Sequence, residues 1–220
     1  MDKISFRITE DGSHTLYLED LDETYHSKHG AIQEALHVFI DAGLKFCNQT
    51  NLNILEIGFG TGLNTFLTLQ ESNNTIINYT SLEAFPLSNE IISQLNYKKE
   101  LSLDTEGIEH FNKLHKVEWG TYQEITPIFN LNKENVELIN YKTTEKFDII
   151  YFDAFGPNVQ PEMWGKAIFE NMYDILADKG ILVTYCAKGS VKRTLKEVGF
   201  EVEPLPGPPG KREMTRAKKL

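Results

Sequence analysis

A short apolar run that leads into three closely spaced glycines constrains this chain more than any other feature. Residues 53–64, NILEIGFGTGLN, place glycine at positions 58, 60 and 62, directly after a mostly apolar stretch that includes Glu56. Apolar residues on both sides of such a run are typical of a strand covered on both faces in a parallel sheet, and residues 64–70 are expected to begin the returning helix. The glycines let a ligand approach the backbone closely, and the N–H groups of the helix start point into the same crevice. The chain is therefore predicted to be an α/β protein with a ligand site at this turn.

The spacing of the glycines indicates which ligand binds. A dinucleotide fingerprint, G-x-G-x-x-G, requires its third glycine at position 63, but Leu63 occupies that position and the glycine comes one residue early. This spacing counts against NAD. The pattern E-x-G-x-G-x-G that begins at Glu56 instead resembles the first motif of class I S-adenosylmethionine methyltransferases. Such a site needs a second acid at the tip of the next strand for the ribose hydroxyls, and Glu83 follows residues 76–82 at the required distance.

Composition places the chain among single-domain globular enzymes. Its 220 residues are 40% hydrophobic and 25% charged, and no apolar run approaches the roughly 18 residues that a membrane span requires. The N-terminus shows no basic region followed by an apolar core, so no signal peptide is predicted and a cytoplasmic location is expected. Cys47 and Cys186 have no metal or redox spacing and are expected to be reduced core residues.

The net charge of −10 is unevenly spread along the chain. Residues 179–220 hold ten Lys and Arg against four acids, a local balance of +6, so the remainder carries −16. Such asymmetry favours one face that tolerates phosphates on an otherwise repelling body. Solvated faces of ordinary helices and strands explain the same pattern equally well.

The N-terminal part is predicted to form an appendage of residues 1–50, and residues 51–220 are predicted to form the main domain. Residues 4–8 and 15–18 alternate in polarity around an Asp-Gly turn, which indicates a β-hairpin, and residues 29–47 have the apolar spacing of an amphipathic helix. His26 and His29 lie in the loop between them. No carboxylate or cysteine nearby completes a ligand set, so no metal site is predicted.

The later strands follow from the same patterns. Residues 116–119 are expected to form the third strand, after which Thr121 takes the place where many methyltransferases have an acid for the adenine amine. The adenine contact is left to the backbone or to Glu124. Residues 130–146 are polar and are expected to be a surface insertion. Residues 200–205 are expected to form the sixth strand, and residues 213–218 are expected to pair antiparallel with it.

Asp153 stands at the end of the predicted fourth strand, residues 147–153, in the turn DAFGPN. Ligands of open α/β sheets bind at this carboxyl edge. An amine attacks a sulfonium methyl only as its free base, and a carboxylate beside it can accept a hydrogen bond, orient the lone pair and take the proton. Phe155 offers a flat face for a base, and Pro157 stiffens the turn. The alternative is that Asp153 only caps the following helix or turn.

Four motifs are found at residues 55–64, 82–87, 153–157 with 161–164, and 210–214. Their joint occurrence in this order resembles the methyltransferase half of the bifunctional MnmC enzymes. The chain also has a Tyr, a Gly and a Glu where that family has them, at positions 25, 30 and 34. The resemblance implies a class I S-adenosylmethionine-dependent methyltransferase fold, Rossmann-like, with a seven-stranded sheet whose last strand is antiparallel.

The resemblance also implies a reaction and a set of site residues. The reaction is methylation of the 5-aminomethyl group of (2-thio)uridine at the tRNA wobble position, giving 5-methylaminomethyl-(2-thio)uridine, with S-adenosylmethionine as donor. The chain is similar to the stand-alone, MnmD-like form without the FAD oxidase half, so neither FAD nor a metal is expected and a separate chain would supply the aminomethyl substrate. The implied residues are Glu56, Gly58, Gly60, Gly62, Asn64 and Glu83 for the cofactor, Asp153 for catalysis, and Tyr25, Phe155, Pro157, Lys211 and Arg212 for the RNA.

Two other functions stay open on the sequence. The chain could be a small-molecule amine methyltransferase or aminopropyltransferase, against which its basic C-terminal part counts. It could also be a non-catalytic S-adenosylmethionine- or RNA-binding module, in which an acid at the tip of the fourth strand, Asp153, would be unnecessary.

Overall fold

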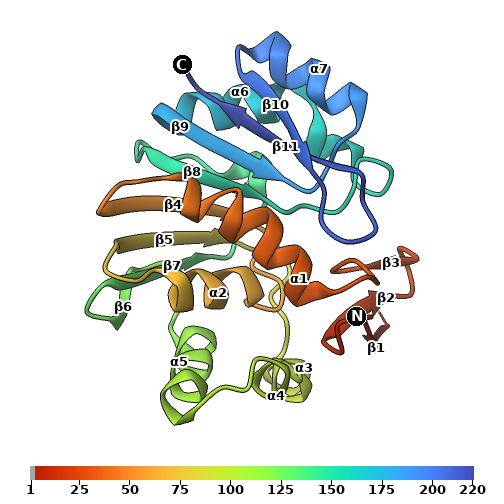
Figure 1. Cartoon of the computed structure of the whole chain (residues 1–220), viewed down its shortest axis with the longest axis vertical. Coiled ribbons are helices and arrows are strands. Elements are labelled where there is room, and N and C mark those ends of the chain that lie inside the picture. The colour runs from red at the N-terminus through yellow and green to blue at the C-terminus, as the bar shows by residue number, and fades with distance from the viewer. Residues whose placement is uncertain (1–2) are drawn as a thin grey trace.

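The computed structural model describes residues 3–220, which form a small N-terminal sheet beside a large mixed sheet (Figure 1). The small sheet has the order β1-β2-β3, and the large sheet has the order β10-β11-β9-β8-β4-β5-β7-β6. The strands are β1 (Ile4–Ile8), β2 (His14–Leu18), β3 (Glu23–Thr24), β4 (Asn51–Ile57), β5 (Ile76–Leu82), β6 (Gln123–Thr126), β7 (Phe129–Glu134), β8 (Phe147–Phe152), β9 (Leu176–Thr184), β10 (Glu201–Pro206) and β11 (Glu213–Lys218).

The five central strands of the large sheet are parallel, and β11 runs antiparallel between β9 and β10. This arrangement confirms the predicted class I methyltransferase architecture, including its antiparallel last strand. One addition was not predicted. β6 pairs antiparallel with β7 and extends the sheet to eight strands.

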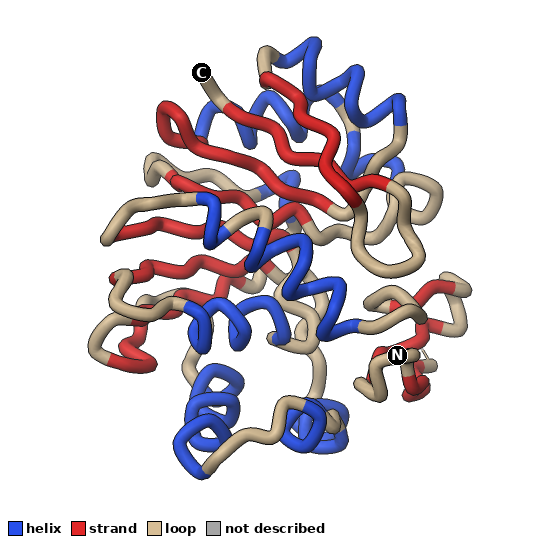
Figure 2. The backbone as a smooth tube through the Cα atoms, in the orientation of Figure 1, coloured by secondary structure: helices blue, strands red, loops and turns tan. Residues whose placement is uncertain are grey.

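Helices cover both faces of the large sheet, as the tube in Figure 2 shows. One apolar core lies between the sheet and α1, η1, α2 and α5, and a second lies between the sheet and α6 and α7. The helices are α1 (Ala31–Ala35), the π-helix η1 (Leu36–Asp41), α2 (Leu63–Glu71), α3 (Asn89–Gln94), α4 (Tyr97–Glu100), α5 (Thr105–Lys116), α6 (Lys166–Ile175) and α7 (Gly189–Val198); short 3₁₀ turns are η2 (Leu44–Phe46), η3 (Leu138–Asn140) and η4 (Pro161–Trp164).

The predicted position of the third strand was wrong. Lys116 ends α5, and Trp119 makes only an isolated bridge to Lys133. The third strand of the parallel order is β7, inside the segment predicted to be a surface insertion, and it pairs with β5 along its length. Its polar residues misled the prediction because one face of β7 is not covered by a helix. There Asn130 donates a hydrogen bond to Asn78 of β5.

The N-terminal hairpin is confirmed, and the structure adds β3 to it. The predicted helix over 29–47 is shorter and irregular, with an α-helical start, a π-helical second half and a separate 3₁₀ turn. In Figure 1 the small sheet lies beside the carboxyl edge of the parallel strands, next to the glycine turn. The division of the chain at residue 50 stays a prediction. Within residues 3–220, no helix has the length and apolar character needed to cross a membrane.

Candidate active site

The three glycines form a tight loop between β4 and α2, at the carboxyl edge of the sheet. All three have positive φ angles, 93° at Gly58, 50° at Gly60 and 72° at Gly62, which side chains rarely adopt. A Cβ atom on Gly60 would lie 3.2 Å from the Tyr25 ring. At its three glycines the loop therefore leaves little room for a side chain and presents bare backbone below the N-terminal segment.

Glu83 joins this loop to the tip of β5. Its carboxylate accepts hydrogen bonds from the backbone N–H of Gly60 at 2.8 Å and of Phe85 at 2.9 Å. Gly58 N and Phe59 N both donate to the carbonyl of Leu82, which precedes it. Glu83 is partly exposed, so its carboxylate lies at the carboxyl end of β5, where the sequence predicted an acid.

Glu56 lies below the loop and is fully buried. Its Oε2 atom accepts hydrogen bonds from Thr65 of α2 at 2.9 Å and from Ser81 of β5 at 2.6 Å. Burial raises the pKa of this carboxyl to about 7, while the two hydroxyl donors oppose that shift. Glu56 therefore ties α2 and β5 together from beneath the cofactor loop.

Asp153 follows β8 and lies beside the start of α2. The Asn64 amide donates to its Oδ2 atom at 2.8 Å, and the backbone N–H of Asp153 donates to Ile57. Burial, together with the negative charge of Glu34, raises the pKa of Asp153 well above its ordinary value. Asn64 is itself buried, and its Oδ1 atom has no hydrogen-bond partner within residues 3–220. An unpaired buried acceptor at this place fits a ligand that carries an N–H or O–H donor.

The turn after Asp153 is held rigidly from two sides. The Trp164 indole donates to the carbonyl of Phe155, and the Tyr185 hydroxyl donates to the carbonyl of Ala154, both at 2.8 Å. The Phe155 ring meets Tyr25 edge-on, with ring centroids 5.3 Å apart. The structure thus brings Tyr25 and Phe155, which are 130 positions apart in the chain, into one aromatic corner above the glycine loop. Pro157 is partly buried in the same turn.

Lys211 and Arg212 have different surroundings although they are neighbours. The Lys211 ammonium pairs with Glu34 of α1 at 2.5 Å and lies 4.0 Å from the centre of the Tyr185 ring. Arg212 is exposed. Lys211 is therefore held by an ion pair within the site, whereas Arg212 is presented to solvent, and the placement of both side chains beside the RNA stays a prediction.

Three further residues lie at the site. Sequence reasoning assigned no chemical role to Glu34 and Tyr185, and Glu134 lies in the segment predicted to be a surface insertion. Glu34 and Tyr185 surround Asp153 and Lys211, and Glu134 ends the true third strand next to Glu83, whose N–H donates to the Glu134 carbonyl. Glu134, and neither Thr121 nor Glu124, lies at the tip of the third parallel strand. Had Phe129 and Leu131 been recognised as the buried face of a strand, this acid would have followed from it.

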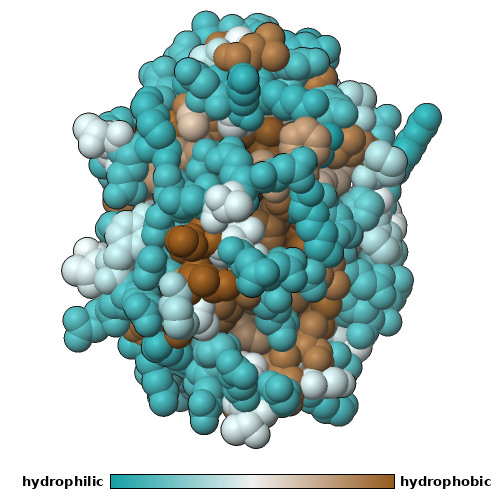
Figure 3. Space-filling view, turned by 60° about the vertical axis from the view of Figure 1, so that its left-hand side comes forward, coloured by the Kyte–Doolittle hydropathy of each residue, from teal (hydrophilic) through white to brown (hydrophobic). Residues whose placement is uncertain are grey.

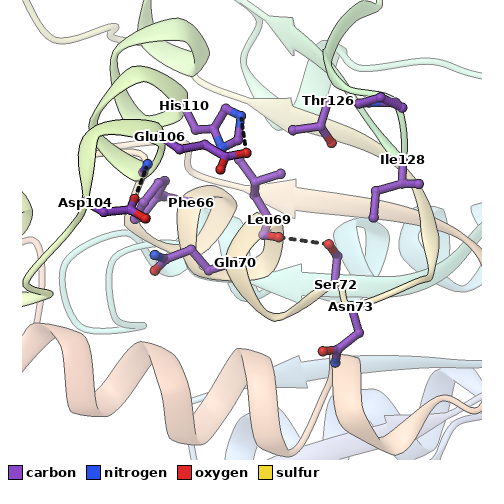
Figure 4. A pocket seen from close by; sticks show the side chains of 12 residues that line it. Phe66, Leu69, Gln70, Ser72, Asn73, Asp104, Glu106, His110, Thr126 and Ile128 are labelled. Carbon is purple, nitrogen blue, oxygen red and sulfur yellow. Dashed lines mark hydrogen bonds and ion pairs between the residues drawn. The ribbon is translucent and has the colours of Figure 1, made fainter.

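A separate cavity lies at the opposite edge of the sheet (Figure 4). Its lining comes from the end of α2, the start of α5 and the turn between β6 and β7, including Gln70, Asn73, His110 and Thr126. Figure 3, which brings this side of the molecule forward, shows a mostly hydrophilic face with hydrophobic side chains in its hollows. Because open α/β sheets bind ligands at the carboxyl ends of their strands, this cavity is not the candidate active site.

The parallel sheet, the glycine loop and the acids at successive strand tips define a methyltransferase of the class that uses a nucleoside-linked methyl donor. A sequence profile for a family described as S-adenosyl-L-methionine-dependent methyltransferase matches residues 93–220, more than half of the chain. The protein belongs to this family of S-adenosyl-L-methionine-dependent methyltransferases.

Curated relatives point within this class to one group of enzymes. The chain is 32% identical over 218 residues to the tRNA 5-methylaminomethyl-2-thiouridine biosynthesis bifunctional protein MnmC of Leptospira interrogans, and 30% identical to the protein of the same name from Cupriavidus necator. These matches cover 89% and 91% of this chain but 32% of each relative. The chain therefore spans about a third of the length of these relatives.

Solved structures show the same fold. The structure of MNMC2 from Aquifex aeolicus matches with a TM-score of 0.78 and 24% identity, covering 99% of this chain and 70% of that chain. The pyocyanin biosynthetic protein PhzM matches with a TM-score of 0.53 at 12% identity, covering 88% of this chain and 56% of that chain. At these identities the matches show the fold alone.

Proposed function

We propose that this enzyme methylates the amine nitrogen of 5-aminomethyl-(2-thio)uridine at the wobble position of tRNA, giving the 5-methylaminomethyl product. The observation that carries the proposal is the placement of Asp153: a partly buried carboxylate with a raised pKa, between the glycine loop and the aromatic corner of Tyr25 and Phe155. The names of the MnmC relatives, which refer to biosynthesis of this nucleoside, support the choice of substrate.

The residues present fit S-adenosylmethionine as the methyl donor. The side-chain-free loop at Gly58, Gly60 and Gly62 would hold its methionine part, and Glu83 its ribose hydroxyls, with Glu134 at the adjacent strand tip for the adenine. The buried Oδ1 of Asn64 is available to its ammonium group. When bound, this donor supplies an electrophilic methyl group on a positively charged sulfur.

Asp153 would receive the substrate amine. An alkyl amine reaches the site as an ammonium ion at neutral pH, and a carboxylate with a raised pKa attracts that ion and accepts its proton more readily than an ordinary aspartate. The Asn64 amide fixes one carboxylate oxygen and leaves the other free for the amine. Phe155 offers its ring to the uracil base by stacking.

The RNA backbone would be held by exposed cations around this opening. Arg212 lies in the turn between β10 and β11, and Lys188, Arg193 and Lys196 are exposed at or near α7. Their charges attract phosphates locally even though the whole chain is acidic.

The test is incubation of the purified chain with labelled S-adenosylmethionine and tRNA that carries 5-aminomethyl-2-thiouridine, followed by nucleoside mass spectrometry. The methylaminomethyl nucleoside is expected with the wild type. Asp153→Asn should lower kcat by roughly 10²–10⁴-fold, because it removes the proton acceptor and keeps the size of the side chain. Methylation of free polyamines with no transfer to tRNA would overturn the substrate assignment, and an Asn variant with wild-type turnover would remove Asp153 from the mechanism.

A further inference from the structure

Three charged or polar groups from distant parts of the chain surround the candidate catalytic acid, Asp153. Glu34 comes from α1, Lys211 from the turn between β10 and β11, Tyr185 from the end of β9, and Asp153 from the end of β8. Lys211 bridges Glu34 and the face of the Tyr185 ring, and the Tyr185 hydroxyl holds the backbone directly after Asp153. The side chain of Glu34 is only 10% exposed, and its second oxygen accepts a hydrogen bond from Ser27 N. Neither Glu34 nor Lys211 is therefore an ordinary surface charge.

We propose that the ion pair of Glu34 with Lys211 is a positioning device that neutralises the carboxylate beside Asp153 and leaves Asp153 to receive the substrate amine, and so matches the site to a substrate with one alkylammonium charge. This inference rests on the proposed function, because it concerns the acid that receives the amine. Lys211 thereby acts inside the active site and not as a phosphate contact.

The charges that face Asp153 come from every element packed around it. Burial is the main reason that its pKa is raised, the charges of Glu34 from α1 and Glu56 from β4 raise it further, and the Asn64 amide and Lys211 lower it. Tyr185 stays neutral, because burial and the charge of Asp153 raise its pKa well above the usual value. Removal of the lysine charge should therefore favour the protonated form of Asp153, and removal of the Glu34 charge should favour the carboxylate.

This arrangement supports the transfer of one proton from the substrate to Asp153. The substrate ammonium gives one proton to the Asp153 carboxylate, the N–H bonding pair stays on nitrogen as the lone pair, and Asp153 becomes a neutral acid beside a neutral amine. An unpaired Glu34 would compete for the same ammonium ion and hold it away from Asp153. The pairing with Lys211 removes this competitor.

The experiment compares Lys211→Met, Glu34→Gln and the double variant. Carbon NMR follows the titration of the Asp153 side-chain carboxyl carbon in protein without substrate. Its signal is assigned because it is lost in Asp153→Asn. In a second measurement, kcat/KM for tRNA is determined as a function of pH. Lys211→Met should move both the NMR midpoint and the acid limb to higher pH, which lowers kcat/KM at the acid end roughly tenfold. Glu34→Gln should move both to lower pH. The double variant should return toward wild type, and it stays informative if Lys211→Met alone does not fold.

Glu71→Gln is the matched control, because Glu71 also pairs with a lysine, Lys45 at 3.1 Å, but lies at the far end of α2. In Glu71→Gln, the NMR titration midpoint of Asp153 and the acid limb of the kcat/KM profile should equal those of the wild type. Unmoved midpoints in all Glu34 and Lys211 variants would overturn the inference, as would weaker S-adenosylmethionine binding in Glu34→Gln without a pH shift, which would make Glu34 a cofactor ligand. The NMR arm needs no turnover, so shifted midpoints in a protein that does not methylate tRNA would refute the proposed function alone.

Discussion

Glu56 and Glu83 carry the same carboxyl group in opposite surroundings. Glu83 is partly exposed, and its carboxylate accepts hydrogen bonds from two backbone N–H groups. Glu56 is fully buried, and burial raises its pKa to about 7. Glu56, the first acid of the glycine motif, therefore links α2 to β5 through hydrogen bonds, and its carboxyl group has a pKa near physiological pH.

This pKa shift predicts how stability depends on pH. The folded protein holds the Glu56 proton up to about pH 7, whereas the unfolded chain releases it near 4.5, so stability is lost as pH rises between these values, by about 3 kcal/mol. Glu56→Gln keeps a neutral hydrogen-bonding side chain and should lose less stability from pH 5 to pH 8. Urea unfolding of both proteins at the two pH values measures the difference, and equal changes would show that Glu56 does not titrate in this range.

Single residues also show where sequence reasoning ends. The positions of Asp153 and Glu83 were predictable because each residue directly follows a recognisable strand and therefore lies at the carboxyl edge of the sheet. The role of Lys211 was not, because its partner Glu34 is 177 positions away and only the tertiary fold brings them together. A Lys-Arg pair in a Gly/Pro-rich turn has the sequence pattern of an RNA contact, and nothing local distinguishes the lysine that turns inward.

Among the elements, the glycine loop makes a sharp prediction. Gly60→Ala puts a methyl group 3.2 Å from the Tyr25 ring at a φ of 50°, and Gly199→Ala at the end of α7 meets its nearest atoms at 3.6 Å at a φ of 118°, which is also a positive φ that side chains rarely adopt. Both variants should lose roughly 1–2 kcal/mol of stability. Only Gly60→Ala should also weaken S-adenosylmethionine binding, by more than about tenfold in calorimetry. Equal affinity in the two variants would remove the loop from the cofactor site.

The turn between β10 and β11 makes another prediction. Arg212→Gln removes an exposed charge and should reduce the salt dependence of tRNA binding by about one unit of slope per lost phosphate contact, with S-adenosylmethionine affinity unchanged. Lys45→Gln is the control, because Lys45 is paired with Asp41 and Glu71 away from the opening. If Arg212→Gln and the control bind tRNA alike across salt concentrations, the RNA lies against another surface. The exposed cations at or near α7, Lys188, Arg193 and Lys196, would then be the next candidates.

The strands that were predicted well and the strand that was missed differ in how they are covered. β4 and β8 are packed on both faces and read as continuous apolar runs, whereas β7 alternates buried residues such as Phe129 and Leu131 with asparagines. The polar face exists because η3 is the only helical element between β7 and β8. A search for continuous apolar runs cannot find such a strand, and the missing helix is not visible in its sequence.

At the scale of the whole molecule, cofactor binding should stabilise the fold. A ligand at a hundred times its Kd adds about 2.7 kcal/mol to the free energy of unfolding, which for a chain of this size corresponds to a rise in Tm of roughly 5–10 °C. S-adenosylhomocysteine should produce such a rise, and NAD and FAD should not. Thermal unfolding with each compound makes the comparison, and a shift with NAD would contradict the reading of the glycine spacing.

The outer strand β10 has a consequence for the protein at high concentration. It carries Pro204 and Pro206, which lie opposite Thr215 and Glu213 of β11 and have no N–H to offer a neighbour. A further strand from a second copy would find two missing donors on this rim. The opposite rim, β6, is only four residues long. The large sheet thus ends on both sides in strands that resist being extended, which should keep crowded copies from joining edge to edge into aggregates.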